Sequence, residues 1–464
     1  MSILHAYHSK LPFRNIKGKP YITVSAKGIS NGLSDTYNDG ADFGPDTLLN
    51  ATSKDQYGPP YTYSYGILEA WNYAVNNTIP YPSGSIRNNF LHKIVLGDGI
   101  FYISQPITLT APFAVNNLNF EGQGMMPTYV GTTSGFPTTE NMITIDPNIL
   151  QWSNFTFKDI QFFGKCNTYL YADFSSSSTN ANTNVLQLEN VDISGSNWGT
   201  YSIYANALNA LYANNFEDYS TEGAYFNGTR NAYIQSPFIS SFALSISGFS
   251  NVILTMGTNL EYTNTVTGLQ LSLSDIYNMS IGIFIPYQYV GIYVNGNVHN
   301  LDIGQIVSRY GATLFSTKSS SAVSIENLHI GTLNVSNNST LTFSNSSLIN
   351  FNSIDIHILD VESGSSLTSY PFQSTVNGTT AGTVEMMFTE YTPTYKKLVV
   401  TFNGYENDTT TNQTIYFPMP FSFRAAMSAG YGNPTVLTLE PSYMIIEAPN
   451  STTTYTGLII FEGY

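Results

Sequence analysis

Charged side chains are scarce in this chain of 464 residues, where Asp, Glu, Lys and Arg together make up 10%. An average globular domain has about 25%. Apolar residues still make up 42%, so the composition is not that of a disordered chain. The formal net charge is −15, which argues against nucleic acid as a partner, because phosphate binding needs basic patches. With few ion pairs to lose, we also expect a melting temperature that is nearly flat from neutral pH to about pH 3.

Cysteine and long apolar runs are also nearly absent. Cys166 is the one cysteine, which excludes an internal disulfide and fits a small buried apolar residue. The uncharged stretch 276–298 is interrupted by Pro286 and several Asn, Gln and Gly residues, so we predict no membrane-spanning helix. The N-terminus lacks the apolar run of a signal peptide. Residues 1–36 are instead rich in Lys and Arg, and we interpret them as an arm that could anchor the protein to a particle; the alternative is a solvated leader.

Short strand-like segments recur through the middle of the sequence. The clearest copies of the pattern Asn-apolar-x-apolar-Gly begin at Asn278, Asn300 and Asn327, 22 and 27 residues apart. One short strand per 20–30 residues is typical of a solenoid, and the alternation of apolar and polar residues has the period of a strand. Leucine-rich repeats need a longer leucine consensus that is not present. The pattern therefore predicts a parallel β-helix with coils about 4.8 Å apart, in which Asn and Gly form the bends.

Three regions follow from these patterns. Residues 64–77 have apolar side chains at helical spacing, which predicts a helix that covers the open apolar end of the solenoid. Residues 37–383 are the predicted β-helix. Residues 384–464 contain short strands separated by turn clusters, which predicts a small β-sandwich. The predicted fold class is all-β.

The opening of the predicted solenoid resembles a known family. NDGADFGPDT (38–47), GILEAWNYAV (66–75), IVLGDGIFYISQPITL (94–109) and NLNFEGQGMMPTYV (117–130) resemble the opening of pectin-lyase-like β-helix proteins, which include viral tailspikes. The acids and glycines of 38–47 are then turn and cap residues, not a calcium loop or a catalytic pair. The C-terminal segments FNGYENDTTTNQTIYFPMPFS and APNSTTTYTGLIIFEGY look like a terminal module of surface fibres of viruses that infect thermophilic archaea.

The resemblance implies a right-handed β-helix in a spike or fibre that is a homo-oligomer, as spikes of this type often are trimers. It implies carbohydrate as the partner but does not decide whether the protein cuts it. The D-D, G-H-G and R-x-K motifs of the family's galacturonan hydrolases are absent from the sequence. Tailspike hydrolases place their carboxylates in varied positions, so the missing motifs do not exclude hydrolysis. We expect no cofactor and no metal.

Two groups of residues are candidates for catalysis. The middle position of the repeat points away from the core, and it holds Asp302, His329 and Asp355 on successive predicted coils. Two carboxylates around an imidazole could perform acid–base work; the alternative is an ionic ladder on a polar wall. Asp192 and Ser280 hold the same position in other copies.

The second group lies in NFEDYSTEG, with Glu217, Asp218 and Glu222. Beside Tyr219 and Tyr225, these acids could form a carboxylate pair on a sugar-binding platform; the alternative is a solvated loop between coils. Tyrosine faces stack on sugar rings and their hydroxyls form hydrogen bonds. For the same reason the cluster IPYQYVGIY suggests Tyr287 and Tyr289 as glycan-binding residues.

Three functions remain open from the sequence. The first is a spike or fibre on a virion surface that binds a cell-surface carbohydrate or glycoprotein of the host and other virion proteins. The second is a polysaccharide depolymerase, a glycosidase or lyase, on the same scaffold. The third is a cellular surface adhesin. We favour the first, on the virion surface and thus outside the cell.

Overall fold

The structure, a computed structural model, forms two compact units, Met1–Met279 and Ser280–Tyr464. It describes residues 21–26, 41–49, 62–80, 89–90, 92–110, 117–124, 127–146, 154–175, 184–197, 199, 201–220, 223–236, 244–256, 271–286, 290–309, 311–352, 354–362, 365–368, 373–377, 381–392, 395–406, 413–416, 423–429, 436–440, 443–446 and 455–463. Each unit is considered separately below.

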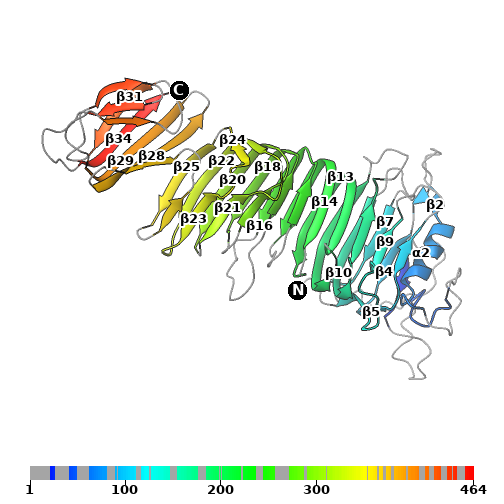
Figure 1. Ribbon diagram of the computed structural model, residues 1–464. Coiled ribbons are helices and arrows are strands. Elements are labelled where there is room, and N and C mark those ends of the chain that lie inside the picture. Colours follow the sequence, from blue (N-terminus) through cyan, green and yellow to red (C-terminus); the bar gives the residue numbers. More distant parts are fainter. Residues whose placement is uncertain are drawn as a thin grey trace, which may run out of the picture. The chain divides into compact units, whose positions relative to one another are not determined.

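Unit 1 is built from short parallel strands on a winding chain (Figure 1). Its strands are β1 (Tyr21–Val24), β4 (Lys93–Leu96), β5 (Gly99–Ile103), β6 (Ile107–Leu109), β7 (Asn117–Glu121), β8 (Thr128–Thr132), β9 (Ile143–Ile145), β10 (Asn154–Cys166), β11 (Leu170–Asp173), β12 (Val185–Asn197), β13 (Ile203–Asp218), β14 (Ala224–Ser236), β15 (Leu244–Ser247), β16 (Asn251–Met256) and β17 (Leu271–Ser274), with a small antiparallel pair, β2 (Ile79–Pro80) and β3 (Asn89–Phe90). The next strand, β18 (Ile276–Phe284), contains the division between the units.

The parallel pairings join strands of successive coils into three groups, which we call columns. One column joins β1, β4, β7 and the first halves of β10 and β12. The second joins β5, β8 and the later halves of β10 and β12. The third joins β6, β9, β11 and the start of β13. Three columns of parallel strands on one winding chain are consistent with the predicted parallel β-helix.

Bends inside the long strands are made by polar residues in the left-handed region. Asp159, Asn190 and Asn215 have φ of 56°, 56° and 51°, which Asn and Asp tolerate better than other non-glycine residues. Their side chains form a ladder: Asn190 Nδ2 donates to Asp159 Oδ1 and Asn215 Nδ2 donates to Asn190 Oδ1, each at 2.5 Å. The predicted role of Asn in bends is confirmed here.

The core of unit 1 runs along the inside of the coils. Aromatic rings stack on neighbouring coils, with Phe120 and Phe157 centroids 5.6 Å apart and their planes 6° from parallel. Phe155 and Phe174 stack similarly at 5.2 Å. Cys166 is fully buried, as predicted, and burial raises the pKa of its thiol to about 12. A thiol of this kind is a packing residue and not a nucleophile.

The predicted helix forms over a shorter range, α2 (Ile67–Asn76). It contacts β1, β4 and β6 at the N-terminal end of the coils (Figure 1). Trp71 is fully buried, and its Nε1 donates to Thr110 O at 2.7 Å. Gly66, at φ 86°, begins the helix where a Cβ would come within 2.8 Å of the Gly44 backbone. The helix therefore covers apolar surface at this end of the unit.

The described part of residues 38–47 confirms that the acids and glycines of this stretch serve turns and caps. Asp42 Oδ2 accepts hydrogen bonds from Thr23 N at 3.0 Å and Thr23 Oγ1 at 3.1 Å. Residues 1–20 and 27–40 lie outside the described residues. The described part of the predicted arm 1–36 includes β1, which pairs with β4, so this segment is part of the parallel sheet.

Unit 2 begins with further parallel coils. Their strands are β19 (Val290–Val294), β20 (Val298–Ser308), β21 (Ala312–Ser316), β22 (Val323–Val335), β23 (Thr340–Ser344), β24 (Ile349–Phe351), β25 (Ile354–Val361) and β26 (Ser366–Thr368). The predicted repeat register is confirmed, because Asn300 pairs with Asn327 and Leu301 with Leu328.

The predicted role of the repeat glycines is wrong in these copies. Gly304 and Gly331 are not among the described residues with positive φ, and neither are Asn300 and Asn327, so the predicted left-handed bends are not made by these residues. A Cβ on Gly304 would lie 2.6 Å from Gly282 O, and one on Gly331 would lie 2.5 Å from Gly304 O. The glycines are required by the close approach of successive coils.

The C-terminal strands form two antiparallel sheets. The larger contains β27 (Gln373–Asn377), β28 (Ala381–Thr392), β29 (Tyr395–Glu406), β34 (Tyr455–Gly463) and β31 (Phe423–Ala429), and the smaller contains β30 (Gln413–Tyr416), β33 (Tyr443–Ile446) and β32 (Val436–Glu440). Antiparallel pairing thus begins at residue 373, about ten residues before the predicted boundary. None of the described helices is long and apolar enough to cross a membrane.

Candidate functional site

The second column of unit 1 presents two rows of outward side chains. Inward positions such as Phe101, Val130 and Phe162 are buried, and the side chains between them are exposed or half-buried, while Gly131, which has no side chain, is covered. We call this surface the β5–β8 face. Its first row, in register across successive coils, is Ile100, Tyr129, Gln161, Asp192 and Glu217. Its second row is Tyr102, Gly131, Phe163 and Ser194, after which Tyr219 bonds by its backbone N–H to Ile193 O.

The hydrogen-bonded ladder of Asp159, Asn190 and Asn215 determines which residues stand in the first row. Gln161, Asp192 and Glu217 each stand two residues after a ladder residue. Because side chains alternate along a strand, the second residue after each bend points to the same side. The three side chains therefore lie on successive coils, about 4.8 Å apart.

Aromatic rings cluster at the N-terminal end of this face. Phe163 contacts Tyr102 edge to face at 6.2 Å and Tyr129 at 6.1 Å, and Tyr65 contacts Tyr102 at 6.0 Å. Gly131 makes room for this cluster, since a Cβ there would lie 2.2 Å from the Phe163 ring. Tyr102 remains 38% exposed. The rings form an apolar platform beside the polar end of the same face.

The polar end holds two carboxyl groups in register, Asp192 and Glu217. Burial, followed by the negative charges of Glu217 and Asp218, raises the pKa of Asp192 to about 7. Glu217 Oε2 accepts a hydrogen bond from Tyr219 Oη at 3.0 Å. Asp192 has a pKa near neutral pH, and it lies beside Glu217, which accepts a hydrogen bond. This arrangement is suited to acid–base chemistry.

Two buried oxygens on this face have no hydrogen-bond partner among the described residues, Asp192 Oδ1 and Gln161 Oε1. They belong to neighbouring side chains of the first row. The Gln161 amide is turned so that Nε2 donates to Ser194 Oγ at 2.5 Å. A proton on Asp192 would remove the repulsion between these two acceptors, in agreement with the raised pKa.

The sequence suggested that Asp218 lies on the surface together with Glu217. The structure shows that it does not. It is buried, and its carboxyl group accepts hydrogen bonds from Ser202 Oγ at 2.7 Å and Ser220 N at 2.9 Å. Burial raises its pKa, and these hydrogen bonds act in the opposite direction. Asp218 therefore connects coils on the inside of the face, and the loop interpretation of this segment is replaced by the end of β13.

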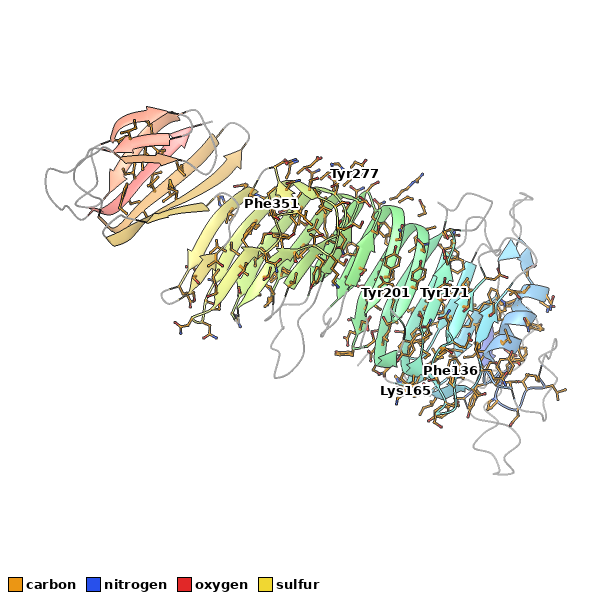
Figure 2. All side chains as sticks on the ribbon, in the orientation of Figure 1. Phe136, Lys165, Tyr171, Tyr201, Tyr277 and Phe351 are labelled. Atoms are coloured by element: carbon orange, nitrogen blue, oxygen red, sulfur yellow. The ribbon has the colours of Figure 1, made fainter. Side chains whose placement is uncertain are left out.

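Tyr225 also lies apart from Tyr219. It belongs to a row of tyrosines on the third column, where its ring stacks on Tyr204 at 5.0 Å and lies 5.0 Å from Tyr201. Tyr171 stacks on the other side of Tyr204 at 5.0 Å. Tyr171 and Tyr201 are labelled in Figure 2.

The other predicted group lies in unit 2. Asp302, His329 and Asp355 are in register on successive coils, as predicted. His329 Nδ1 lies 2.7 Å from Asp355 Oδ2. Burial raises the pKa of Asp355, while the hydrogen bond and charge of His329 and the charge of His357 lower it. Asp302 is exposed. The His329 side chain is exposed and that of Asp355 is half-buried, and a pair of this kind on an outward row agrees with the alternative of a polar ladder.

Three predicted residues, Glu222, Tyr287 and Tyr289, lie outside the described residues. Within the described part of the chain, no group of three or more His, Cys, Asp and Glu could hold a metal ion.

Sequence reasoning placed Asp192 on the outside but did not pair it with Glu217. The signal was present, because Asn215-Phe-Glu-Asp is a further copy of the Asn-apolar-x-apolar repeat. Its fourth position, Asp218, is polar, which concealed the match. Gln161, Tyr102 and Phe163 were missed because their importance depends on contacts between coils about 30 residues apart.

No family model and no curated protein matches the sequence. Among solved structures, a tailspike protein, gp49 of Acinetobacter baumannii bacteriophage Fri1, described as a capsular polysaccharide depolymerase, is similar over 81% of this chain and 79% of its own, at 10% identity and a TM-score of 0.24. This is a weak likeness in the long parallel β-structure, and a score of this size does not establish a common function.

Proposed function

We propose that this chain is a surface spike or fibre protein of a virion, which attaches to host cells by binding their glycans through the β5–β8 face. The observation that carries the proposal is the joining of an aromatic platform and a polar row on one face. The proposal keeps the expected right-handed coils, a C-terminal sandwich and a homo-oligomer such as a trimer, with the N-terminal arm bound to other virion proteins.

The side chains of this face suit the two sides of a sugar ring. The apolar face of a pyranose packs on aromatic rings such as Tyr102 and Phe163, and its hydroxyls exchange hydrogen bonds with amide, hydroxyl and carboxyl groups. Gln161, Ser194 and Glu217 supply such groups along the same rows. Because the rows repeat at about 4.8 Å, an extended glycan can contact several coils at once.

The binding proposal is tested with the full chain on an array of host surface polysaccharides and oligosaccharides. We expect retention on at least one glycan and its loss in Phe163→Ala. Tyr212→Ala is the matched control, because Tyr212 is an exposed tyrosine of another column. Equal losses in both variants, or retention in Phe163→Ala, would reject this face as the binding surface.

Cleavage of the bound glycan is the second candidate function, and the register of Asp192 with Glu217 favours it. Protonated Asp192 would donate its proton to the glycosidic oxygen. Glu217 would bond to the anomeric carbon as the glycosidic C–O bond breaks, as in retaining glycosidases, whose carboxyl groups lie about 5–5.5 Å apart. Ionised Asp192 would then take a proton from water while the water oxygen displaces Glu217 from the anomeric carbon, which releases the second shorter sugar and restores both carboxyl groups.

Release of shortened products from the bound polysaccharide would support cleavage. It should disappear in both Asp192→Asn and Glu217→Gln, while binding persists. Asp302→Asn is the control from unit 2, and we expect it to retain the activity. Binding without new reducing ends would leave attachment as the function.

A further inference from the structure

The β5–β8 face carries acidic groups at its polar end. Asp192 and Glu217 lie on the surface, and the buried carboxyl of Asp218 lies behind them. Burial raises the pKa of Asp192, and the negative charges of Glu217 and Asp218 raise it further. An anionic ligand placed here would meet negative charge in a partly desolvated setting, where repulsion is stronger than in water.

Lysines on the adjoining strands do not compensate for this charge. Lys158 precedes the bend at Asp159 and is paired with Glu189 on the next coil. Lys165 follows Gln161 by four residues, roughly 13 Å of extended chain, beyond a bend at Gly164 with φ 101°. Neither described lysine stands in the two rows of the face.

The remaining side chains of the rows are neutral. Ile100, Tyr102, Tyr129 and Phe163 provide apolar surface, and Gln161, Ser194 and Tyr219 provide hydrogen-bonding groups. Recognition of a carboxylate or sulfate would need Arg or Lys in fixed geometry, and these rows contain neither.

We infer that the glycan recognised by the β5–β8 face is uncharged, and that the face rejects uronic-acid, sialylated and sulfated counterparts of the same glycan through the negative charge of Glu217. This inference rests on the proposed glycan-binding function. It concerns the class of sugar that is bound, and it is based on the acidic and neutral side chains in the two rows of the face. Repulsion of anionic sugars would then be a specificity device added to the stacking surface.

The test is an array of matched glycans, each presented as the neutral form and as its uronic-acid, sialylated or sulfated form. The wild-type protein is expected to bind neutral forms at least tenfold more tightly. Glu217→Gln should narrow this ratio severalfold by admitting anionic forms, where the ratio compares the neutral and anionic forms measured with the same variant. Raising the ionic strength should narrow the ratio in the wild type, because salt screens exposed charges. Asp302→Asn, in unit 2, should leave the ratio unchanged.

The failure of this inference and that of the proposed function give different results. Equal or preferred binding of anionic forms overturns the inference and leaves glycan binding in place. If Glu217→Gln leaves the ratio of neutral to anionic binding unchanged, repulsion by Glu217 is not the cause of the selectivity, and that part of the inference is overturned. Absence of binding to every glycan on the array overturns the proposed function and the inference together.

Discussion

Asp192 on β12 and Glu217 on β13 are register partners on adjacent coils, each two residues after an asparagine bend. The relationship brings two carboxyl groups together from positions 25 residues apart in the sequence. The parallel pairing of β12 with β13 holds the two residues side by side, and the carboxyl groups do not. Either carboxyl group can therefore be substituted without disrupting the fold.

The first prediction concerns the proton on Asp192. Its carboxyl carbon, followed by NMR in the full chain, should titrate near pH 7, because burial and two neighbouring acids raise its pKa. Glu217→Gln should lower that midpoint by removing one negative charge. A midpoint near 4, the ordinary value for Asp, would mean that the Gln161 amide is turned to donate to an ionised Asp192.

A second prediction concerns stability against acid. Asp192, Asp218 and Asp355 all have raised pKa values, so between about pH 4 and pH 7 the native state binds more protons than the unfolded state. The free energy of unfolding then rises as the pH falls through this window. We expect the melting temperature to hold or increase from pH 7 to pH 4, with a smaller increase in Asp192→Asn. A steep loss on acidification would contradict both the pKa shifts and the composition argument.

The asparagine ladder should be a major determinant of unit 1 stability. Asn190→Ala removes two ladder hydrogen bonds and places an alanine at φ 56°, which we expect to cost about 1–3 kcal/mol in the free energy of unfolding. Asn190→Gly keeps the backbone conformation accessible and removes only the side-chain bonds. Chemical denaturation of both variants separates the two contributions; no loss in either would remove the ladder from the account.

Gly131 is predicted to be necessary for the aromatic platform. In Gly131→Ala the new Cβ would meet the Phe163 ring at 2.2 Å, so the ring must move away from Tyr102. We expect glycan binding to weaken about tenfold, or about 1.4 kcal/mol, with only a small change in melting temperature because the ring lies on the surface side. Unchanged binding would show that the platform does not need Phe163 in its observed place.

Much of the fold can be predicted from short patterns. The Asn-apolar-x-apolar repeat gave the parallel register that aligns Asp302 with His329 and His329 with Asp355. The helical spacing around Trp71 gave the helix at the N-terminal end of the coils. These features depend on local periodicity, which a single sequence records directly.

The site is harder to predict, for a physical reason. Coils of unequal length separate Tyr102, Phe163 and Asp192 in the sequence, and their meeting depends on which residues stand after each bend. Asp218 also broke the expected pattern, since a buried hydrogen-bonded carboxyl occupies an apolar position of the repeat. Hydrophobic pattern alone cannot distinguish such a residue from one in a solvated loop.

The central claim is that the β5–β8 face binds glycan, and the most direct measurement compares two tyrosines that are equally exposed. Tyr102 is 38% exposed on this face, and Tyr233 is 37% exposed on another column. Calorimetric titration with a glycan retained by the wild type should show binding weakened about tenfold in Tyr102→Ala and unchanged in Tyr233→Ala. Loss of binding in Tyr233→Ala with full binding in Tyr102→Ala would contradict the account.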